Sequence, residues 1–196
     1  MIECDDFNQA REAARIKYKP ERIRTLLITE APSESNDRFF YFENVRKYDQ
    51  LYISTMKVLY PHVHIKELRD RKASFLQMFK HDGFYLIDAI DSPFTQNDNN
   101  KRRTRIIWDN RHALIQKISS LASEETEIVL IKYTVYELRD YLKEEGYRVI
   151  NRCPIESPGS CHNTEFNIKL KRLLEPSLEG HVRPYMETRN SNFVHG

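Results

Sequence analysis

Glycine is scarce in this sequence, with 5 residues in a chain of 196. Dinucleotide-binding fingerprints and phosphate-binding P-loops both need closely spaced glycines, and neither pattern occurs here, so both nucleotide-binding classes are excluded. Cysteine is also rare. Cys4, Cys153 and Cys161 form an odd set without metal-ligand spacing, which predicts reduced thiols and no metal or other cofactor.

No long apolar run is present and the N-terminus is polar, so we expect neither a membrane-spanning helix nor a signal peptide. With reduced thiols as well, the expected location is the cytoplasm. Neither sign of charge dominates, because 31 Lys and Arg residues stand against 29 Asp and Glu residues. Binding to nucleic acid would therefore depend on a local basic patch rather than on the net charge.

The length fits a single domain with its own core, and we expect a monomer. Residues 1–20 are expected to hold an N-terminal helix, and residues 176–196 a polar C-terminal tail. Between them, four apolar runs indicate strands, and helical patterns long enough to cross over separate these runs. The runs are residues 26–28, 84–87, 128–131 and 147–151. Crossovers of this kind join parallel strands, which predicts an α/β fold, a three-layer α/β/α arrangement on a four-stranded parallel sheet.

The helical patterns cover residues 7–18, 44–60, 69–81, about 106–121, 134–146 and 164–174. Residues 96–105 are polar and basic, and we expect a loop there. Thr134 and Glu137 have the spacing of a capping box at the start of their helix.

Polar residues follow the strands at the edge where parallel strands end together, which is where ligands bind in open α/β sheets. Glu30 follows the first strand and precedes a proline, and Asp88 ends the second. We expect both carboxylates to stand at this crevice, with Glu30 exposed. One would orient or deprotonate a water and the other would hold a polar edge of a substrate. The alternative is that such a carboxylate is a solvated loop residue without a functional role.

A loop of small residues, Ser157-Pro158-Gly159-Ser160, precedes the last predicted helix. The free amides of a helix N-terminus favour an anion such as phosphate, although a plain turn explains the same residues. His162 lies just beyond this loop and is a further candidate.

Four consecutive aromatic residues, 39–42, include Tyr41 and Phe42 as candidates for stacking on a planar ring, with packing in a small core as the alternative. Lys101, Arg102 and Arg103 form a basic run that would suit a DNA backbone, with a solvated surface as the alternative.

From about residue 22 to residue 174, the order and spacing of these motifs resemble the uracil-DNA glycosylase superfamily. Residues 27–32, with Glu30, Ala31 and Pro32, look like its first motif, a strand that ends in Gly-Glu-Ala-Pro-Gly. Residues 85–88 look like the strand that ends in a base-reading Asn, and residues 128–133 look like the penultimate strand. Residues 157–160 occupy the place of the His-Pro-Ser type loop.

The resemblance implies a DNA glycosylase that hydrolyses the N-glycosidic bond of a damaged or deaminated base flipped out of the duplex. Glu30 would correspond to the residue that positions the water, and Asp88 to the residue that reads the base. One aromatic residue between 40 and 42 would stack on the base. Ala31, Pro32 and the loop 157–160 would bind substrate.

This sequence departs from the superfamily pattern at several positions. Thr29 and Ser33 replace glycines, and Ser157 replaces the histidine, whose role His162 would have to take. Asp88 replaces Asn, and an ionised carboxylate accepts hydrogen bonds but cannot donate to a carbonyl, which suits a base that presents donors. The iron–sulfur cysteines of one branch are absent. The alternatives are a non-catalytic protein of this fold that binds nucleic acid or a nucleotide, and a flavodoxin-like domain that binds an unrelated small anion.

Overall fold

The computed structural model describes residues 2–34, 38–44, 49–159 and 163–179. Four strands form one parallel sheet in the order β2-β1-β3-β4, where β1 is Thr25–Thr29, β2 is Phe84–Asp88, β3 is Glu127–Leu130 and β4 is Arg148–Val149. The parallel sheet of four strands is as the sequence predicts. Every residue of β1 and β2 is buried, because helices cover the sheet and continuous apolar runs suit strands covered on both faces.

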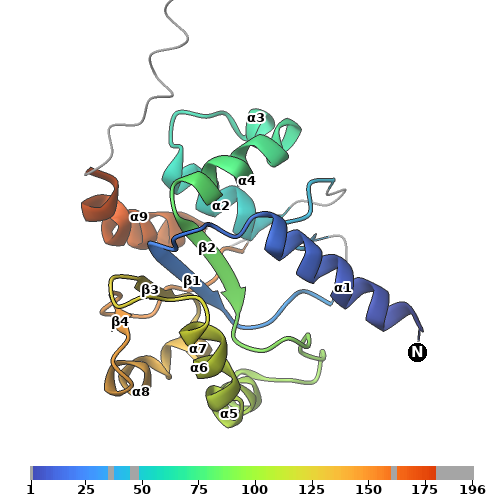
Figure 1. Cartoon of the computed structure of the whole chain (residues 1–196), viewed down its shortest axis with the longest axis vertical. Coiled ribbons are helices and arrows are strands. Elements are labelled where there is room, and N and C mark those ends of the chain that lie inside the picture. The colour runs from blue at the N-terminus through green and yellow to red at the C-terminus, as the bar shows by residue number, and fades with distance from the viewer. Residues whose placement is uncertain (1, 35–37, 45–48, 160–162, 180–196) are drawn as a thin grey trace, which may run out of the picture.

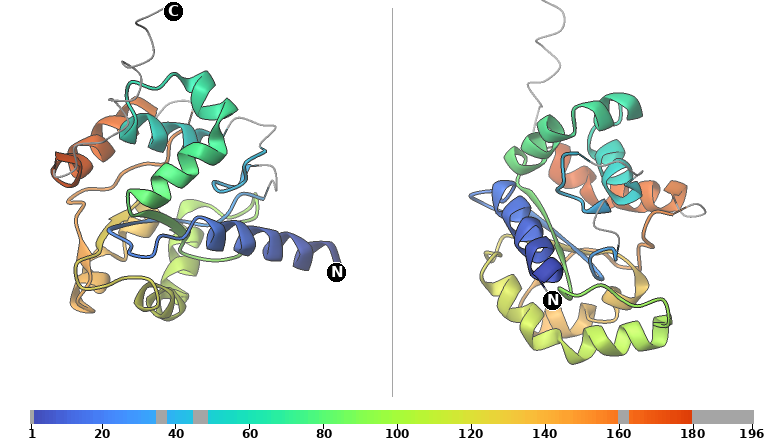
Figure 2. Two further views of the ribbon diagram at one scale, coloured as in Figure 1. Left: turned by 45° about the horizontal axis from the view of Figure 1, so that its top comes forward. Right: turned by 90° about the vertical axis from the view of Figure 1, so that its right-hand side faces the viewer.

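Helices flank this sheet (Figure 1). They are α1 (Ile2–Lys17), α2 (Gln50–Leu59), α3 (Ile65–Asp70), α4 (Lys72–His81), α5 (Asn100–Asp109), α6 (Arg111–Ser119), α7 (Tyr133–Tyr136), α8 (Arg139–Glu144) and α9 (Asn163–Glu179). Helices α2, α3, α4 and α9 gather on one side of the sheet, and α5 to α8 gather on the other (Figures 1 and 2). No helix in the described part of the chain is long and apolar enough to cross a membrane.

Helices α2 and α5 begin away from their predicted positions because capping side chains start them elsewhere. Asp49 accepts a hydrogen bond from the backbone amide of Tyr52, so α2 begins at Gln50 rather than near residue 44. Asn99 accepts from the backbone amide of Arg102, so α5 begins inside the segment that we expected to be a loop. The basic run therefore lies on a helix.

The capping box predicted at Thr134 is wrong. Helix α7 begins at Tyr133 after Lys132, and no side chain caps it. The Thr134 hydroxyl donates to Glu30 instead, so this side chain makes a tertiary hydrogen bond rather than capping the helix. The helix predicted over residues 69–81 corresponds to α4, whereas those predicted over residues 106–121 and 134–146 are each divided into two, α5 with α6 and α7 with α8.

Two buried side chains complete the hydrogen bonding of the sheet. The Tyr41 hydroxyl donates to the carbonyl of Leu86 and accepts from its amide, which satisfies the outer edge of β2. The Asn151 amide makes the same pair of contacts with Leu130, where the two-residue strand β4 has already ended. Tyr41 is therefore a structural residue of the sheet edge.

Candidate functional site

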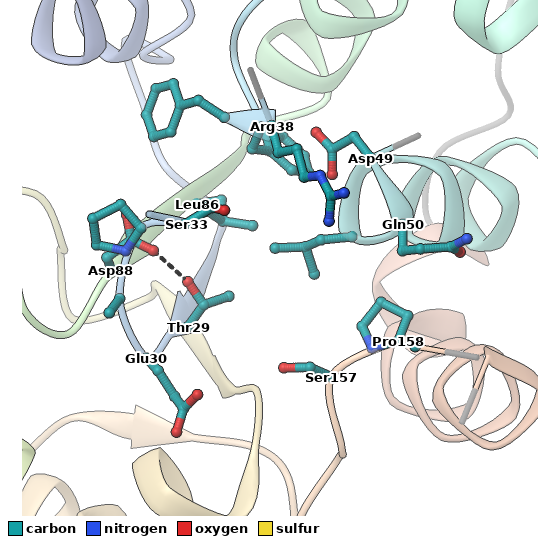
Figure 3. Close-up of a pocket in the computed structure, with 16 residues that line it drawn as sticks. Thr29, Glu30, Ser33, Arg38, Asp49, Gln50, Leu86, Asp88, Ser157 and Pro158 are labelled. Atoms are coloured by element: carbon teal, nitrogen blue, oxygen red, sulfur yellow. Dashed lines mark hydrogen bonds between the residues drawn. The ribbon is translucent and has the colours of Figure 1, made fainter. Parts of the chain in front are cut away.

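A cavity of about 410 Å³ opens at the carboxyl edge of the sheet (Figure 3). Five segments line it, namely residues 29–33 after β1, the end of β2, residues 38–40, the start of α2 and the loop 157–159. Strands β2 and β3 lie on opposite sides of β1, so the strand order reverses at β1, whose carboxyl end forms part of the cavity wall. Crevices at such switch points are the usual ligand sites of open α/β sheets, and the volume is that of a small-molecule site.

Glu30 lies at one wall of this cavity and is 8% exposed. Thr134 donates a hydrogen bond to its Oε1, and Lys132 donates to its Oε2. Arg103 of α5 stands 3.6 Å from the same Oε2. The expectation of an exposed carboxylate is wrong, because residues at the start of α7 and from α5 cover Glu30. A carboxylate can accept about four hydrogen bonds, so Glu30 retains acceptor capacity for a water or a substrate hydroxyl.

Lys132 holds an unusual backbone conformation, with φ of 83° and ψ of 143°. Residues with a side chain rarely adopt this region, and its cost of about 1–3 kcal/mol is tolerated where the surroundings impose it, often at functional sites. The Lys132 amide donates to the carbonyl of Ile155, while its ammonium group binds Glu30. The strained turn thus lets one residue join β3, the segment before the loop 157–159, and Glu30.

Asp88 is more fully enclosed than Glu30, with 4% exposure. Its Oδ1 accepts a hydrogen bond of 2.7 Å from the Thr29 hydroxyl (Figure 3), and its Oδ2 accepts one of 2.6 Å from the Arg15 guanidinium of α1. The Lys117 ammonium group donates to its backbone carbonyl at 3.3 Å. Both carboxylate oxygens are thus engaged by the protein. Asp88 lines the cavity, but its oxygens are held by neighbours from two other elements.

The wall opposite Glu30 contains residues that the sequence analysis did not single out. Asp49, Gln50 and Arg38 line it, and in Figure 3 the Arg38 guanidinium projects into the cavity. Asp49 forms a buried ion pair with Lys72, with 3.3 Å between Oδ2 and Nζ. Burial raises the pKa of Asp49, against the effect of Lys72, and burial lowers the pKa of Lys72. The sequence does contain one sign of this wall: Asp49 directly precedes an apolar helical pattern, as an N-cap residue does.

The structure brings most of the predicted site together. Residues that line the cavity are Glu30, Ala31, Pro32, Asp88, Ser157, Pro158 and Gly159. Tyr41 and Phe42 are not among the lining residues, whereas their neighbours Phe39 and Phe40 are. Tyr41 is instead fully buried, where its hydroxyl binds β2. Ser160 and His162 lie outside the described residues.

The three predicted DNA-backbone residues differ in their surroundings. Lys101 is exposed, whereas Arg102 pairs with Asp98 at 2.8 Å. Arg103 donates to the carbonyl of Asp98 and its guanidinium lies 4.9 Å from the centre of the Phe94 ring. With its approach to Glu30, Arg103 belongs to the cationic surroundings of this carboxylate, behind the cavity wall, rather than to a free basic surface.

Comparison of the chain with protein-family models, curated proteins and solved structures gives no match. Within the described residues, no group of three or more His, Cys, Asp and Glu side chains could hold a metal ion. The site thus offers a covered carboxylate with cationic neighbours, two aromatic rings, and polar groups on the facing wall.

Proposed function

We propose that this protein is an N-glycosidase that acts on a damaged or deaminated base in DNA. The observation that carries the proposal is Glu30, a buried carboxylate beside a ring-sized cavity at the switch point of the sheet. The order of the sequence motifs supports the same reaction through its resemblance to the uracil-DNA glycosylase superfamily. In this reaction, water adds to the anomeric carbon of the sugar while the base leaves with the electron pair of the bond between carbon and nitrogen, and the proton that the water loses ends on the departing base.

Glu30 is the residue that would orient the attacking water. Lys132 and Thr134 fix the direction of its carboxylate, and each oxygen keeps a lone pair beyond the donor that it already has. A fixed acceptor lowers the cost of organising the water during the reaction. Phe39 and Phe40 border the cavity and offer apolar surface to a base. Arg38 on the facing wall is a cation that can stabilise negative charge on the departing base.

Base recognition in this proposal belongs to the wall formed by Asp49, Gln50 and Arg38 rather than to Asp88. Both oxygens of Asp88 already accept hydrogen bonds, from Thr29 and Arg15. Gln50 and Arg38 bring amide and guanidinium groups to the cavity. Donors of this kind suit the carbonyl oxygens of a deaminated base, so uracil, hypoxanthine and xanthine are the substrates to test first.

The test is cleavage of labelled oligonucleotides that contain uracil, hypoxanthine, xanthine or an alkylated base, in single and double strands, with alkali to cut abasic sites. We expect one class of base to be released, and Glu30→Gln to reduce the rate at least a hundredfold. The matched control is Glu144→Gln, which removes the same charge from an exposed position on α8 and should leave the rate unchanged. Equal rates for Glu30→Gln and the unaltered protein would remove Glu30 from the mechanism.

A non-catalytic protein that binds nucleic acid or a nucleotide is the second candidate, and one observation favours it. The donors around Glu30 come from the protein itself, in an arrangement that would also serve purely to stabilise a buried carboxylate. Binding of DNA without release of any base in the panel would select this second function.

A further inference from the structure

A second cavity, of about 500 Å³, lies between α1, β2 and α6. Successive side chains of a strand point to opposite faces, and β2 divides its side chains between the two cavities accordingly. Leu86 and Asp88 line the first cavity, whereas Tyr85 and Ile87 line the second. The two sites are thus separated by the thickness of one strand, and the second cavity is large enough for a small ligand.

Cationic side chains predominate in the lining of this second cavity. Four of its twelve lining residues are Arg or Lys, and two are Asp or Glu. The four cationic residues are Arg11, Arg15, Lys19 and Lys117. Both carboxylates of the lining belong to exposed side chains, since Glu12 is 61% exposed and Asp91 is 71% exposed. Leu121, Ile16 and Ile87 supply an apolar part of the same wall. This combination suits a ligand that carries negative charge at one end and an apolar group at the other.

Arg15 stands between the two cavities. It lines the second cavity, and its guanidinium contacts two residues that line the first: Asp88 at 2.6 Å and the ring of Phe39, with 5.2 Å to the centroid. A guanidinium carries a single positive charge, so an anion bound beside Arg15 in the second cavity and the Asp88 carboxylate compete for that charge. Lys117 also contacts lining residues of both cavities, because its ammonium group donates to Asp91 at 2.7 Å and to the carbonyl of Asp88.

We propose that this second cavity binds a small organic anion with an apolar body, and that this anion competes with Asp88 for the Arg15 guanidinium. The ligand places its anionic group between Arg15 and Lys117 and its apolar body against Leu121 and Ile87. The site does not depend on the reaction proposed above, because none of its contacts with the ligand uses the first cavity. Binding there nevertheless reaches the first cavity through Asp88 and Phe39, and the coupling between the two ligands is reciprocal.

Phenyl phosphate is a suitable probe because it joins one phosphate group to one ring. Its affinity is measured by isothermal titration calorimetry, beside inorganic phosphate and phenol. We expect phenyl phosphate to bind more tightly than either. Lys117→Gln should weaken binding about tenfold, the usual effect of losing one charge-assisted hydrogen bond. If inorganic phosphate bound as tightly as phenyl phosphate, the proposed contact between the apolar body of the ligand and Leu121 and Ile87 would be wrong.

Two variants separate this site from the first cavity. Leu121→Trp fills the second cavity without removing a charge and should abolish binding, while Ser157→Trp narrows the first cavity and should leave binding unchanged. The opposite result would place the probe in the first cavity and overturn the proposal, as would no binding at millimolar concentrations.

Competition for Arg15 has its own signature. Asp88→Asn removes the closer and more buried of the two carboxylates that pair with this guanidinium, the other being Glu12 at 3.7 Å. Phenyl phosphate should therefore bind at least threefold more tightly and raise the melting temperature of this variant more than that of the unaltered protein. Asp91→Asn, which changes the exposed partner of Lys117, is the matched control and should show a smaller increase. Weaker binding to Asp88→Asn than to the unaltered protein would refute the competition. None of these readouts uses glycosidase activity, so failure here is distinct from failure of the proposed reaction.

Discussion

Glu30 follows β1 and Asp88 is the last residue of the neighbouring parallel strand β2, and each is buried at the same edge of the sheet. The partners of Glu30 come from across the switch point and from α5, namely Lys132, Thr134 and Arg103. Asp88 is held by Thr29 of the adjacent strand and by Arg15 of α1. The partners of Glu30 therefore fix a carboxylate at the wall of a cavity, whereas those of Asp88 close a buried ion pair between two cavities. Both carboxylates lie at strand ends, so their different roles follow from the residues that bind them rather than from their position in the sheet.

Replacement of Arg15 gives the largest expected effect on this comparison. Arg15→Met leaves the Asp88 carboxylate buried without its cation, and the loss of one partner from a buried pair typically costs about 3–5 kcal/mol of unfolding free energy. Urea unfolding measures this loss. Arg22→Met is the matched control, because the pair of Arg22 with Glu125 is exposed and should contribute at most about 1 kcal/mol.

The double variant Arg15→Met/Asp88→Asn tests the reason for that loss. It removes both charges and should recover part of the stability, because no uncompensated carboxylate remains. If Arg15→Met were no more damaging than Arg22→Met, the Asp88 pair would not be the buried contact described here.

Lys132 offers a comparison of backbone strain with side-chain chemistry. Lys132→Ala and Lys132→Gly both remove the ammonium group from Glu30, but only glycine relaxes the positive φ. Relief of about 1–3 kcal/mol of strain exceeds the entropy that glycine adds to the unfolded chain, so the glycine variant should be the more stable of the two by about 1 kcal/mol. Thermal unfolding measures the difference. If the proposed reaction is correct, both variants should lose glycosidase activity alike. A glycine variant that is less stable than the alanine variant would show that the turn at Lys132 carries no strain, because only the entropy cost of glycine would then remain.

The sheet could be predicted from the sequence because its strands are continuous apolar runs, a local pattern that burial on both faces requires. The convergence of Glu30, Asp88 and the loop 157–159 followed from the same pattern, since parallel strands end at one edge. Helix boundaries were harder. Asn99 and Asp49 cap helices that begin away from the predicted positions, and short polar side chains are equally common in turns.

The partners of the two carboxylates could not be predicted, because they lie far away in the sequence. Arg15 is 73 positions from Asp88, and Thr134 is 104 positions from Glu30. Tyr41 shows a related limit. Its ring suggested stacking on a ligand. Its hydroxyl instead forms hydrogen bonds with the backbone amide and carbonyl of Leu86, which β2 leaves unpaired because it is an edge strand. The sequence alone does not show that β2 is an edge strand. The resemblance to uracil-DNA glycosylases stays a prediction, on which the proposed reaction depends.

The smallest expected effect concerns two basic residues on α5. Lys101 is exposed, whereas Arg103 reaches Glu30. If DNA lies over this helix, Lys101→Ala should weaken DNA binding by a few-fold at low salt and reduce the slope of log affinity against log salt by about 1, because one phosphate contact is lost. Lys143→Ala, at an exposed position of α8, is the control and should leave that slope unchanged.

Arg103→Ala should instead change turnover more than binding, since its cation stands beside Glu30. An equal salt slope for Lys101→Ala and Lys143→Ala would remove α5 from the DNA-binding surface and leave Arg103 as a residue of the Glu30 site alone.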